Sequence, residues 1–590
     1  MALISRPKKI RRLIKRRSKD ALELSQQADD KIEKLLIRRF DRLISVRRFV
    51  GLWLGLAILL IFTVMLQLRS MSPYYQKLEP TPGGFYSEGL VGDFTNANPL
   101  YANGIADIAV SRLIFSGLLK YDNHNKLAGD LATSWQLSKD QKTYTVKLRH
   151  NAVWQDGQPF TADDVVYTYR MIQDPESQSP LYNNWTGINV TKVDNFTVRF
   201  NLPDSLAAFP SSLTNGIIPA HLLKSTPANQ LRSALFNTNP VGTGPFRWND
   251  VEVSGTGTVD QQQRISLAAN SNYYFGRPNL DGFSLLTFTD EAHLTKAFNK
   301  KQVNSMSGLE TLPNNIAKSN TQTYVTPLDS IVMAFFNNSN SVLSDSKVRL
   351  AMVRGVDRQP LVNLFNYPTN LADSPLLRGE LGYRPVQQSY NLDKAKALLR
   401  QDGWHKNSHG VETKHGKTLE FTLRTQDTNN YAQVAEYLQQ QWSKLGITVD
   451  VRYYDSNDLQ SDIIANHDYD ILLYGISIGA DPDVFAYWDS SQASISSEGH
   501  LNLSEYKSSL ASQSLEAGRT RSDPKLRVIK YRSFLNVWGQ DAPALALYQP
   551  NFLYITHGPI YNYQRQADIN IADRFYNVNT WMIRQTRQTL

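Results

Sequence analysis

The chain of 590 residues contains no cysteine. Zinc ribbons, iron–sulfur clusters, thiol nucleophiles and a lipid attached to an N-terminal cysteine are therefore excluded. The absence does not identify the compartment, because an exported protein can fold without disulfides. With 41% hydrophobic and 20% charged residues, the composition is that of a globular protein rather than a disordered or fibrous one. The length is sufficient for several domains.

An excess of positive charge is also missing from most of the chain, although the net charge is +9. Residues 1–48 carry 16 Lys and Arg against 6 Asp and Glu, whereas the remaining 542 residues carry 47 basic and 48 acidic groups. A basic surface is the electrostatic signature of nucleic-acid binding, and a neutral body lacks it. Nucleic acid is therefore not an expected partner.

One long uncharged run follows the basic segment. Residues 49–68 read FVGLWLGLAILLIFTVMLQL, and as a helix they would span about 30 Å, the thickness of the hydrocarbon core of a bilayer. Because Arg47 and Arg48 precede the run, the positive-inside rule places residues 1–48 in the cytoplasm and the rest outside. We expect an uncleaved single-pass anchor in the cell membrane. A cleaved signal peptide is the alternative, although its apolar region is usually about 7–15 residues long.

The basic segment has apolar residues at helical spacing, which leaves two interpretations. It forms an amphipathic helix that binds anionic lipid or a cytoplasmic partner, or it only fixes the membrane topology. We favour the second. The apolar positions are Ile32, Leu35, Leu36, Phe40, Leu43 and Ile44.

After a polar spacer at 69–82, the chain alternates short strands with helices. Period-two alternation predicts strands, and capping residues followed by apolar stripes predict helices. The order of strand, helix and strand between 419 and 475 indicates the α/β class with parallel pairing. The predicted strands cover 144–148, 196–202, 419–423, 447–453 and 470–474, and helices are predicted after Thr161, after Asn391 and over 434–445.

The sequence contains no complete catalytic or metal-binding motif. The glycine-rich segment at 242–246 lacks the lysine of a phosphate loop, and Gly242 and Gly244 indicate a structural turn. Three histidines, His405, His409 and His415, could bind a metal together with Glu412, but the glycines around them favour an exposed hairpin. We therefore expect neither an enzyme nor a cofactor.

Two carboxylates follow the predicted buried strand at 470–474. Asp481 and Asp483 lie just beyond its carboxyl end, where open α/β sheets bind ligands. They could receive a cation or a ligand amine, or act as an acid/base pair. Alternatively, Asp483 caps the helix that begins at Val484.

A series of short segments, in a fixed order, covers about residues 83–550. They are GLLKY (117–121), LAGDLATSW (127–135), KTYTVKLR (142–149), VWQDG (153–157), TADDVVY (161–167), NPVGTGPF (239–246), DSKVRLA (345–351), VDR (356–358), DKAKALL (393–399), GW (403–404), LGI (445–447), DYD (468–470) and APA (542–544). Together they resemble family 5 of the extracytoplasmic solute-binding proteins, which serve bacterial dipeptide, oligopeptide and nickel ABC importers.

The resemblance implies a periplasmic-binding-protein-like type II clamshell with an additional inserted domain, closing over ligand at a hinge without catalysis. We expect lobe I over 83–335 with an inserted subdomain at about 105–235, lobe II over 336–544, and a return to lobe I over 545–590. The residues expected near a ligand are Asn98, Tyr101, Tyr474, Ser477, Asp481, Asp483 and Trp488.

Several of these residues have alternative interpretations. Tyr101 and Trp488 could be ordinary core residues, and Asn98 could stabilise the turn before Pro99. Peptide binders of the resembling family place an Asp before the Asp-Pro segment to pair with the ligand amine, and that position here is Ile478. A free peptide amine would lose a charge-assisted bond of about 1.5–3 kcal/mol. Either Asp481 substitutes, or the ligand is not a peptide with a free amine.

The resulting hypothesis is a membrane-anchored extracytoplasmic protein that captures peptides or related solutes and delivers them to an ABC transporter permease. The first alternative is a cell-surface sensor or adhesion receptor on the same fold, signalling through residues 1–48. The second is an envelope hydrolase that uses Asp481 and Asp483 or the histidine cluster.

Overall fold

The structure is a computed structural model that describes residues 30–31, 47–255, 261–316, 320–497, 499–564 and 568–589. It divides into an N-terminal unit, Met1–Glu79 with Gln585–Leu590, and a main unit, Pro80–Arg584. The apolar positions of the predicted tail helix, from Ile32 to Ile44, lie outside the described residues.

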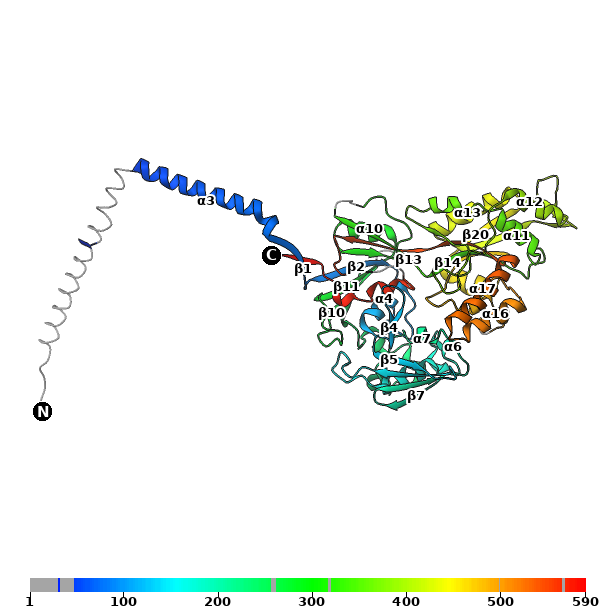
Figure 1. Cartoon of the computed structure of the whole chain (residues 1–590), viewed down its shortest axis with the longest axis horizontal. Coiled ribbons are helices and arrows are strands. Elements are labelled where there is room, and N and C mark those ends of the chain that lie inside the picture. The colour runs from blue at the N-terminus through cyan, green and yellow to red at the C-terminus, as the bar shows by residue number, and fades with distance from the viewer. Residues whose placement is uncertain are drawn as a thin grey trace. The chain divides into compact units, whose positions relative to one another are not determined.

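The N-terminal unit is dominated by the helix α3 (Arg47–Tyr75), labelled in Figure 1. Its segment Phe49–Met71 has a mean hydropathy of 2.6, and its central window packs against nothing. The helix extends past the predicted run and ends at Tyr75. Among the described residues it is the one helix long and apolar enough to cross a bilayer. Both a membrane anchor and a signal sequence have this length and composition. Strand β1 (Gln76–Thr81) follows it and pairs with β24 (Arg584–Thr589).

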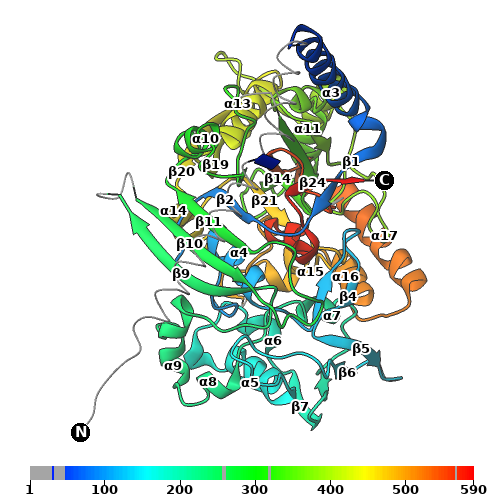
Figure 2. The same ribbon diagram turned by 90° about the vertical axis from the view of Figure 1, so that its left-hand side faces the viewer.

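The main unit contains a seven-stranded sheet with the order β13-β23-β12-β2-β11-β10-β9. The central strand β2 runs parallel to both neighbours, whereas the outer pairs are antiparallel. Figure 2 shows β9, β10 and β11 side by side. The strands are β2 (Phe85–Val91), β9 (Phe246–Ser254), β10 (Gln262–Ala269), β11 (Gly282–Phe288), β12 (Ser305–Ser307), β13 (Thr321–Pro327) and β23 (Asn551–His557).

A second sheet has six strands in the order β15-β22-β14-β21-β19-β20. Strand β19 runs parallel to β20 and to β21, which confirms the parallel pairing predicted from the sequence. The strands are β14 (Ser330–Phe336), β15 (Asn370–Leu371), β19 (Glu420–Gln426), β20 (Thr448–Tyr454), β21 (Ile471–Ser477) and β22 (Ala544–Gln549). Its helices include α11 (Ser346–Arg354), α12 (Leu392–Gln401), α13 (Asn429–Ser443), α16 (Ser509–Arg519) and α17 (Pro524–Asp541).

A four-stranded antiparallel sheet, β5-β6-β8-β7, forms a separate layer of the main unit. Its strands are β5 (Ala132–Leu137), β6 (Thr143–Leu148), β7 (Asn189–Asp194) and β8 (Thr197–Asn201). Helix α5 (Ala162–Ile172) covers it and begins with a capping box between Thr161 and Asp164, as the sequence predicts.

Two chain segments connect the seven-stranded and six-stranded sheets. The first joins β13 to β14 through Leu328, and the second joins β22 to β23 through Pro550. They are bonded to each other, because the Leu328 amide donates to the Pro550 carbonyl at 2.9 Å. The Gln549 side chain also donates to the Leu328 carbonyl at 2.9 Å. The two sheets are thus joined by a narrow double connection.

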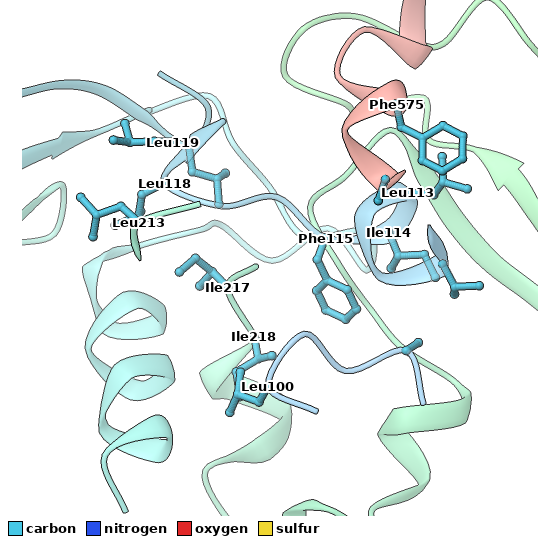
Figure 3. Packing of buried hydrophobic residues seen from close by; sticks show 14 of the residues in the cluster. Leu100, Leu113, Ile114, Phe115, Leu118, Leu119, Leu213, Ile217, Ile218 and Phe575 are labelled. Carbon is cyan, nitrogen blue, oxygen red and sulfur yellow. The ribbon is translucent and has the colours of Figure 1, made fainter. Parts of the chain in front are cut away.

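Helix α4 (Ile105–Ile114) anchors the core beside the seven-stranded sheet. Figure 3 shows Leu113 at its end beside Phe575, while Leu118 and Leu119 pack near Leu213. The turn that contains Gly242 and Gly244 approaches the same helix end. A Cβ at Gly242 would lie 2.0 Å from the Ile114 carbonyl oxygen. This close approach agrees with the structural role predicted for the two glycines.

Candidate ligand-binding site

A cavity of about 670 Å³ lies where α4, the layer around β5–β8 and the loop after β21 converge. This volume falls within the range of small-molecule sites in proteins. Its charged lining residues are Arg112, Asp481, Asp483, Arg519 and Asp573, and its amide and hydroxyl lining residues are Ser111, Asn183, Asn184, Ser211, Ser212, Thr214, Asn215 and Asn570.

Asp481 is held by Arg527 of α17 in a two-pronged ion pair. The guanidinium donates from Nη2 to Oδ1 at 2.5 Å and from Nη1 to Oδ2 at 2.9 Å. Arg527 also donates to the Gly518 carbonyl at 3.1 Å and to the Tyr531 hydroxyl at 3.2 Å. Burial works against the Arg527 charge, but the Asp481 carboxylate outweighs it and raises the pKa of Arg527. The carboxylate is therefore already satisfied by the protein.

Asp483 is paired with Arg519, which lies at the end of α16. The guanidinium Nε is 3.3 Å from Oδ2, and the Arg519 side chain stacks over the Phe485 ring at 4.2 Å. Burial raises the pKa of Asp483, and the charge of Arg519 opposes that rise. Helix α15 (Phe485–Trp488) begins here, with Val484 at the N-cap position, and its first amide donates to Asp483 at 3.4 Å.

The third pair lies on the opposite wall. Arg112 of α4 is 3.7 Å from Asp573, which belongs to the short helix η7 (Ile571–Phe575). Asp573 completes a capping box with Asn570, so its position is fixed by the backbone. Each of the five charged side chains that line the cavity thus has a partner of opposite charge.

The segment Ser211–Gly216 supplies five of the uncharged lining residues. Tyr121 adds a phenol, and burial raises its pKa to about 12, which keeps it uncharged at neutral pH. The walls also touch directly, because the Ala207 amide donates to the Arg519 carbonyl at 2.9 Å. The Ser522 amide likewise donates to the Gln141 side chain at 3.1 Å. The layer around β5–β8 and the six-stranded sheet therefore meet across the cavity.

Of the seven residues predicted near a ligand, Asp481 and Asp483 line the cavity. Asn98 is fully buried and donates to Asn237 at 3.0 Å, while its oxygen accepts from the Leu100 amide, as expected of a turn residue. The Tyr101 hydroxyl donates to the Ser177 carbonyl at 2.8 Å, and Trp488 is fully buried between Phe335 and Trp538.

The two remaining predicted residues belong to β21. The Tyr474 hydroxyl is bonded to the Gln460 side chain. Ser477 is exposed, and its carbonyl accepts a hydrogen bond from the Tyr487 hydroxyl at 2.9 Å. Neither residue lines the cavity.

Sequence reasoning did not select Arg112, Arg519, Asn570 or Asp573, all of which line the cavity. The basic residue in the last turn of a helix is the one signal that marks Arg112 and Arg519, and that signal also fits a helix terminus. The Asn570-x-x-Asp573 spacing marks a capping box, but it does not indicate a cavity wall.

The histidine cluster lies apart from the cavity. His405, His409 and His415 are exposed around the small sheet formed by β16 (His405–Lys406), β17 (Glu412–Lys414) and β18 (Lys417–Thr418). Within the described residues, no group of three or more His, Asp or Glu side chains is arranged to hold a metal ion.

A second cavity of about 620 Å³ lies beside the connection between the sheets. It is lined by Asp329, Arg358, Asp373 and Glu380, among others. Glu380 accepts a bond from the Leu377 amide through Oε2 at 2.8 Å. Its buried Oε1 has no hydrogen-bond partner within the described part of the chain. Burial, followed by the charges of Asp329 and Asp481, raises the pKa of Glu380 well above its usual value.

Comparison with known proteins gives a consistent result. Residues 126–497 match the model of the bacterial extracellular solute-binding proteins, family 5. The oligopeptide-binding protein AppA of Bacillus subtilis is 27% identical over 529 residues, which cover 86% of this chain and 92% of AppA.

Solved structures agree with the sequence matches. AppA of Bacillus subtilis in complex with a nonapeptide superimposes with a TM-score of 0.70 at 26% identity, covering 86% of this chain and all of AppA. NikZ of Campylobacter jejuni in complex with Ni(L-His) gives a TM-score of 0.72 at 25% identity, covering 85% of this chain and 99% of NikZ. The type II periplasmic-binding-protein fold expected from the sequence is thereby confirmed.

Proposed function

Because the chain belongs to family 5 of the bacterial extracellular solute-binding proteins, we propose that it is a membrane-anchored binding protein that captures peptides or related solutes outside the cytoplasm. It delivers them to the permease of an ABC transporter. The family consists of solute-binding proteins rather than enzymes. The relatives include peptide-binding proteins, such as AppA with its bound nonapeptide.

The observation that carries the proposal is the 670 Å³ cavity between walls that come from different sheets. Closure around the double connection would trap a solute there and exclude water from it. In this proposal the seven-stranded and six-stranded sheets belong to the two lobes, and the hinge lies at Leu328 and Pro550. The proposed lobe boundaries therefore lie at Leu328 and Pro550 rather than near 335 and 544, because β14 and β22 pair within the six-stranded sheet.

The proposed anchor is α3, with the N-terminus in the cytoplasm. Its segment Phe49–Met71 is long enough to cross the hydrocarbon core of a bilayer. The 16 basic residues before it would be retained on the cytoplasmic side. An anchor of this kind keeps the binding protein at the membrane surface, where it can meet a permease.

Native mass spectrometry tests the binding proposal directly. The full-length chain is purified in detergent without added solute and is weighed before and after denaturation. We expect an additional mass, or a set of masses, that is released by denaturation and matches peptides or related solutes. A solute-free mass that a peptide library does not shift would contradict the proposal.

A pair of variants ties the bound mass to the cavity. Asn184→Trp places a bulky side chain at an exposed lining position, and occupancy should fall at least tenfold. Asn189→Trp is the matched control, because Asn189 is equally exposed on β7 and does not line the cavity. Equal loss in both variants would place the ligand elsewhere.

Delivery is tested by deleting residues 1–40 while the helix α3 is kept. Cells that carry the shortened chain should still take up the solute identified above, because Arg42, Arg47 and Arg48 remain before the apolar run and preserve the topology. Loss of uptake with normal membrane insertion would instead mean that the basic segment contributes to delivery by binding lipid or a cytoplasmic partner.

A further inference from the structure

Within the described residues, each charged side chain on the cavity walls is paired with a side chain of opposite charge. Asp481, Asp483 and Asp573 face Arg527, Arg519 and Arg112, respectively. A ligand ammonium or carboxylate that enters the cavity must therefore compete with an existing ion pair, because every charged lining residue in the described part of the chain already has a partner. The cavity thus differs from one that offers a single uncompensated carboxylate.

The Asp481 pair is the hardest to break. The Arg527 side chain is 8% exposed, and its Nε, Nη1 and Nη2 atoms all donate hydrogen bonds. If a ligand ammonium displaced Arg527 from Asp481, the guanidinium would stay buried without its counter-charge. The ligand would therefore have to compensate for an unpaired buried cation before it gained anything from the new contact.

The stretch of wall that precedes Asp481 carries no carboxylate. Ile478, Gly479 and Ala480 line the cavity consecutively, and Ile478 is 7% exposed and packs into the adjoining core. The Ile478 and Gly479 amides both donate to the Asp329 carbonyl, at 2.9 Å and 3.2 Å. This stretch therefore presents an apolar surface at the place where an amine-binding group could otherwise stand.

The polar side-chain groups that remain for recognition are amides and hydroxyls, beside apolar side chains such as Phe115 and Leu206. Asn183 and Asn184 are exposed at the cavity, and Ser212, Thr214 and Asn215 also line it. Such groups form hydrogen bonds with backbone amides or with hydroxyl groups without any demand for charge. Their number and the cavity volume of about 670 Å³ are compatible with an extended ligand that forms hydrogen bonds at several points along its chain.

We propose that this cavity selects its ligand through uncharged amide or hydroxyl groups and does not recognise a free ammonium. The inference rests on the proposed function and specifies its ligand class. A peptide whose amine is blocked, or a hydroxyl-rich conjugate, fits the lining as well as a free peptide or better. The specificity-determining residues are Ile478 and the Asp481–Arg527 pair.

The experiment presents the full-length chain, in detergent, with an equimolar library of random tetrapeptides, half of them N-acetylated, together with a set of hydroxyl-rich sugar–amino acid conjugates. Retained molecules are separated by gel filtration and identified by mass spectrometry. We expect acetylated peptides or conjugates to be retained within threefold of the free peptides, or in excess over them.

Two results would overturn the inference and are distinguishable from each other. At least tenfold enrichment of free-amine peptides rejects the ligand class but leaves the proposed binding function intact. Retention of no library member rejects the proposed peptide-type function and the inference with it. Enrichment of conjugates over acetylated peptides identifies hydroxyl groups, rather than amides, as the recognised chemistry.

Two variants should gain the ability to recognise a free ammonium. Ile478→Asp adds a carboxylate without an arginine partner, and Arg527→Gln frees the existing carboxylate of Asp481. Either variant should increase the preference for free-amine peptides at least tenfold, whereas the matched control Ile478→Asn should not. Circular dichroism and retention of acetylated peptide verify that each variant is folded. A folded pair of variants with unchanged preference would overturn the assignment.

Discussion

Two ion pairs of the main unit have the same chemistry and different surroundings. Glu88 on β2 binds Arg574 of η7, and both side chains are completely buried. Asp481 binds Arg527, with side chains 23% and 8% exposed, at the edge of a cavity. The first pair lies in a closed core, whereas the second forms part of a cavity wall.

The surroundings of Glu88 leave no capacity for another ligand. Its oxygens accept from the Ser307 hydroxyl at 2.7 Å and from the Tyr554 hydroxyl at 2.9 Å. Arg574 lies over the Phe575 ring at 4.0 Å. Burial raises the pKa of Tyr554 further above its usual value, so this hydroxyl stays a donor. An ion pair alone therefore does not indicate a ligand-binding site. Only a pair that borders a cavity, as Asp481 and Arg527 do, can contact a ligand.

The largest effect is expected when the closed pair is broken. Glu88→Gln leaves Arg574 buried without a counter-charge, and the free energy of unfolding should fall by about 3–5 kcal/mol. Urea unfolding of the full-length chain in detergent, followed by tryptophan fluorescence, measures the change. Lys142→Gln is the control, because it breaks an exposed pair with Asp204 that contributes about 0–1 kcal/mol. Equal losses in both variants would remove the distinction between core and surface pairs.

A smaller effect on stability, but a visible effect on binding, is expected at the cavity wall. Asp481→Asn removes a charge-assisted bond beside water-accessible space, and the free energy of unfolding should fall by about 1.5–3 kcal/mol. The same urea titration gives this value, and native mass spectrometry reports the occupancy. A loss as large as that of Glu88→Gln would show that the two pairs are equivalent.

Glu380 differs from the carboxylates of both pairs, because its buried Oε1 has no hydrogen-bond partner within the described residues. Burial raises its pKa in the folded protein, so the folded state holds a proton that the unfolded state releases at a lower pH. Its contribution to stability is therefore present below the unfolded pKa of about 4.3 and is lost as the pH rises through the raised folded pKa.

The prediction is that Glu380→Gln removes this loss. Relative to the natural chain, the variant should gain thermal stability at pH 7 and show little gain near pH 4, as differential scanning fluorimetry at a series of pH values would reveal. Asp140→Asn is a suitable control, because the pKa of Asp140 is lowered by hydrogen bonds from Ser138 and Lys142 at the surface. A gain that does not depend on pH would assign the effect to packing.

The smallest effect is expected for Arg519→Gln. The Arg519 side chain is 29% exposed and lies 3.3 Å from Asp483, so its loss should cost about 1 kcal/mol or less. Urea unfolding under the same conditions measures this cost. A loss above that of Asp481→Asn would mean that the stacking of Arg519 on Phe485 matters more than the ion pair.

Local elements of the fold could be predicted from the sequence because their signals are local. Asn391 caps α12 through a bond from the Lys394 amide, and Gly403 follows the helix with a φ of +89°. The alternating residues of β6 and β19 place the expected side chains inward. The resemblance to a family supplied the overall architecture, which periodicity alone does not give.

The walls of the cavity could not be predicted in the same way. The pairing of Asp481 with Arg527 joins residues 46 positions apart, and it depends on how α16 and α17 fold back. Trp488, expected near a ligand, lies in the core instead. An aromatic residue that follows a strand of a sheet is compatible with either location. Here it is fully buried beside Trp538. Tertiary packing, which no short motif encodes, decides both cases.

The pairing of β1 with β24 has a consequence for biosynthesis. These are the first and last strands within the described residues, so their two-stranded sheet can form only after β24 has emerged from the ribosome. Segments translated between them can fold earlier, since contacts between residues close in sequence form first. A ribosome-stalled chain, or one truncated before Arg584, would leave β1 unpaired. Completion of this sheet therefore requires that translation has passed β24.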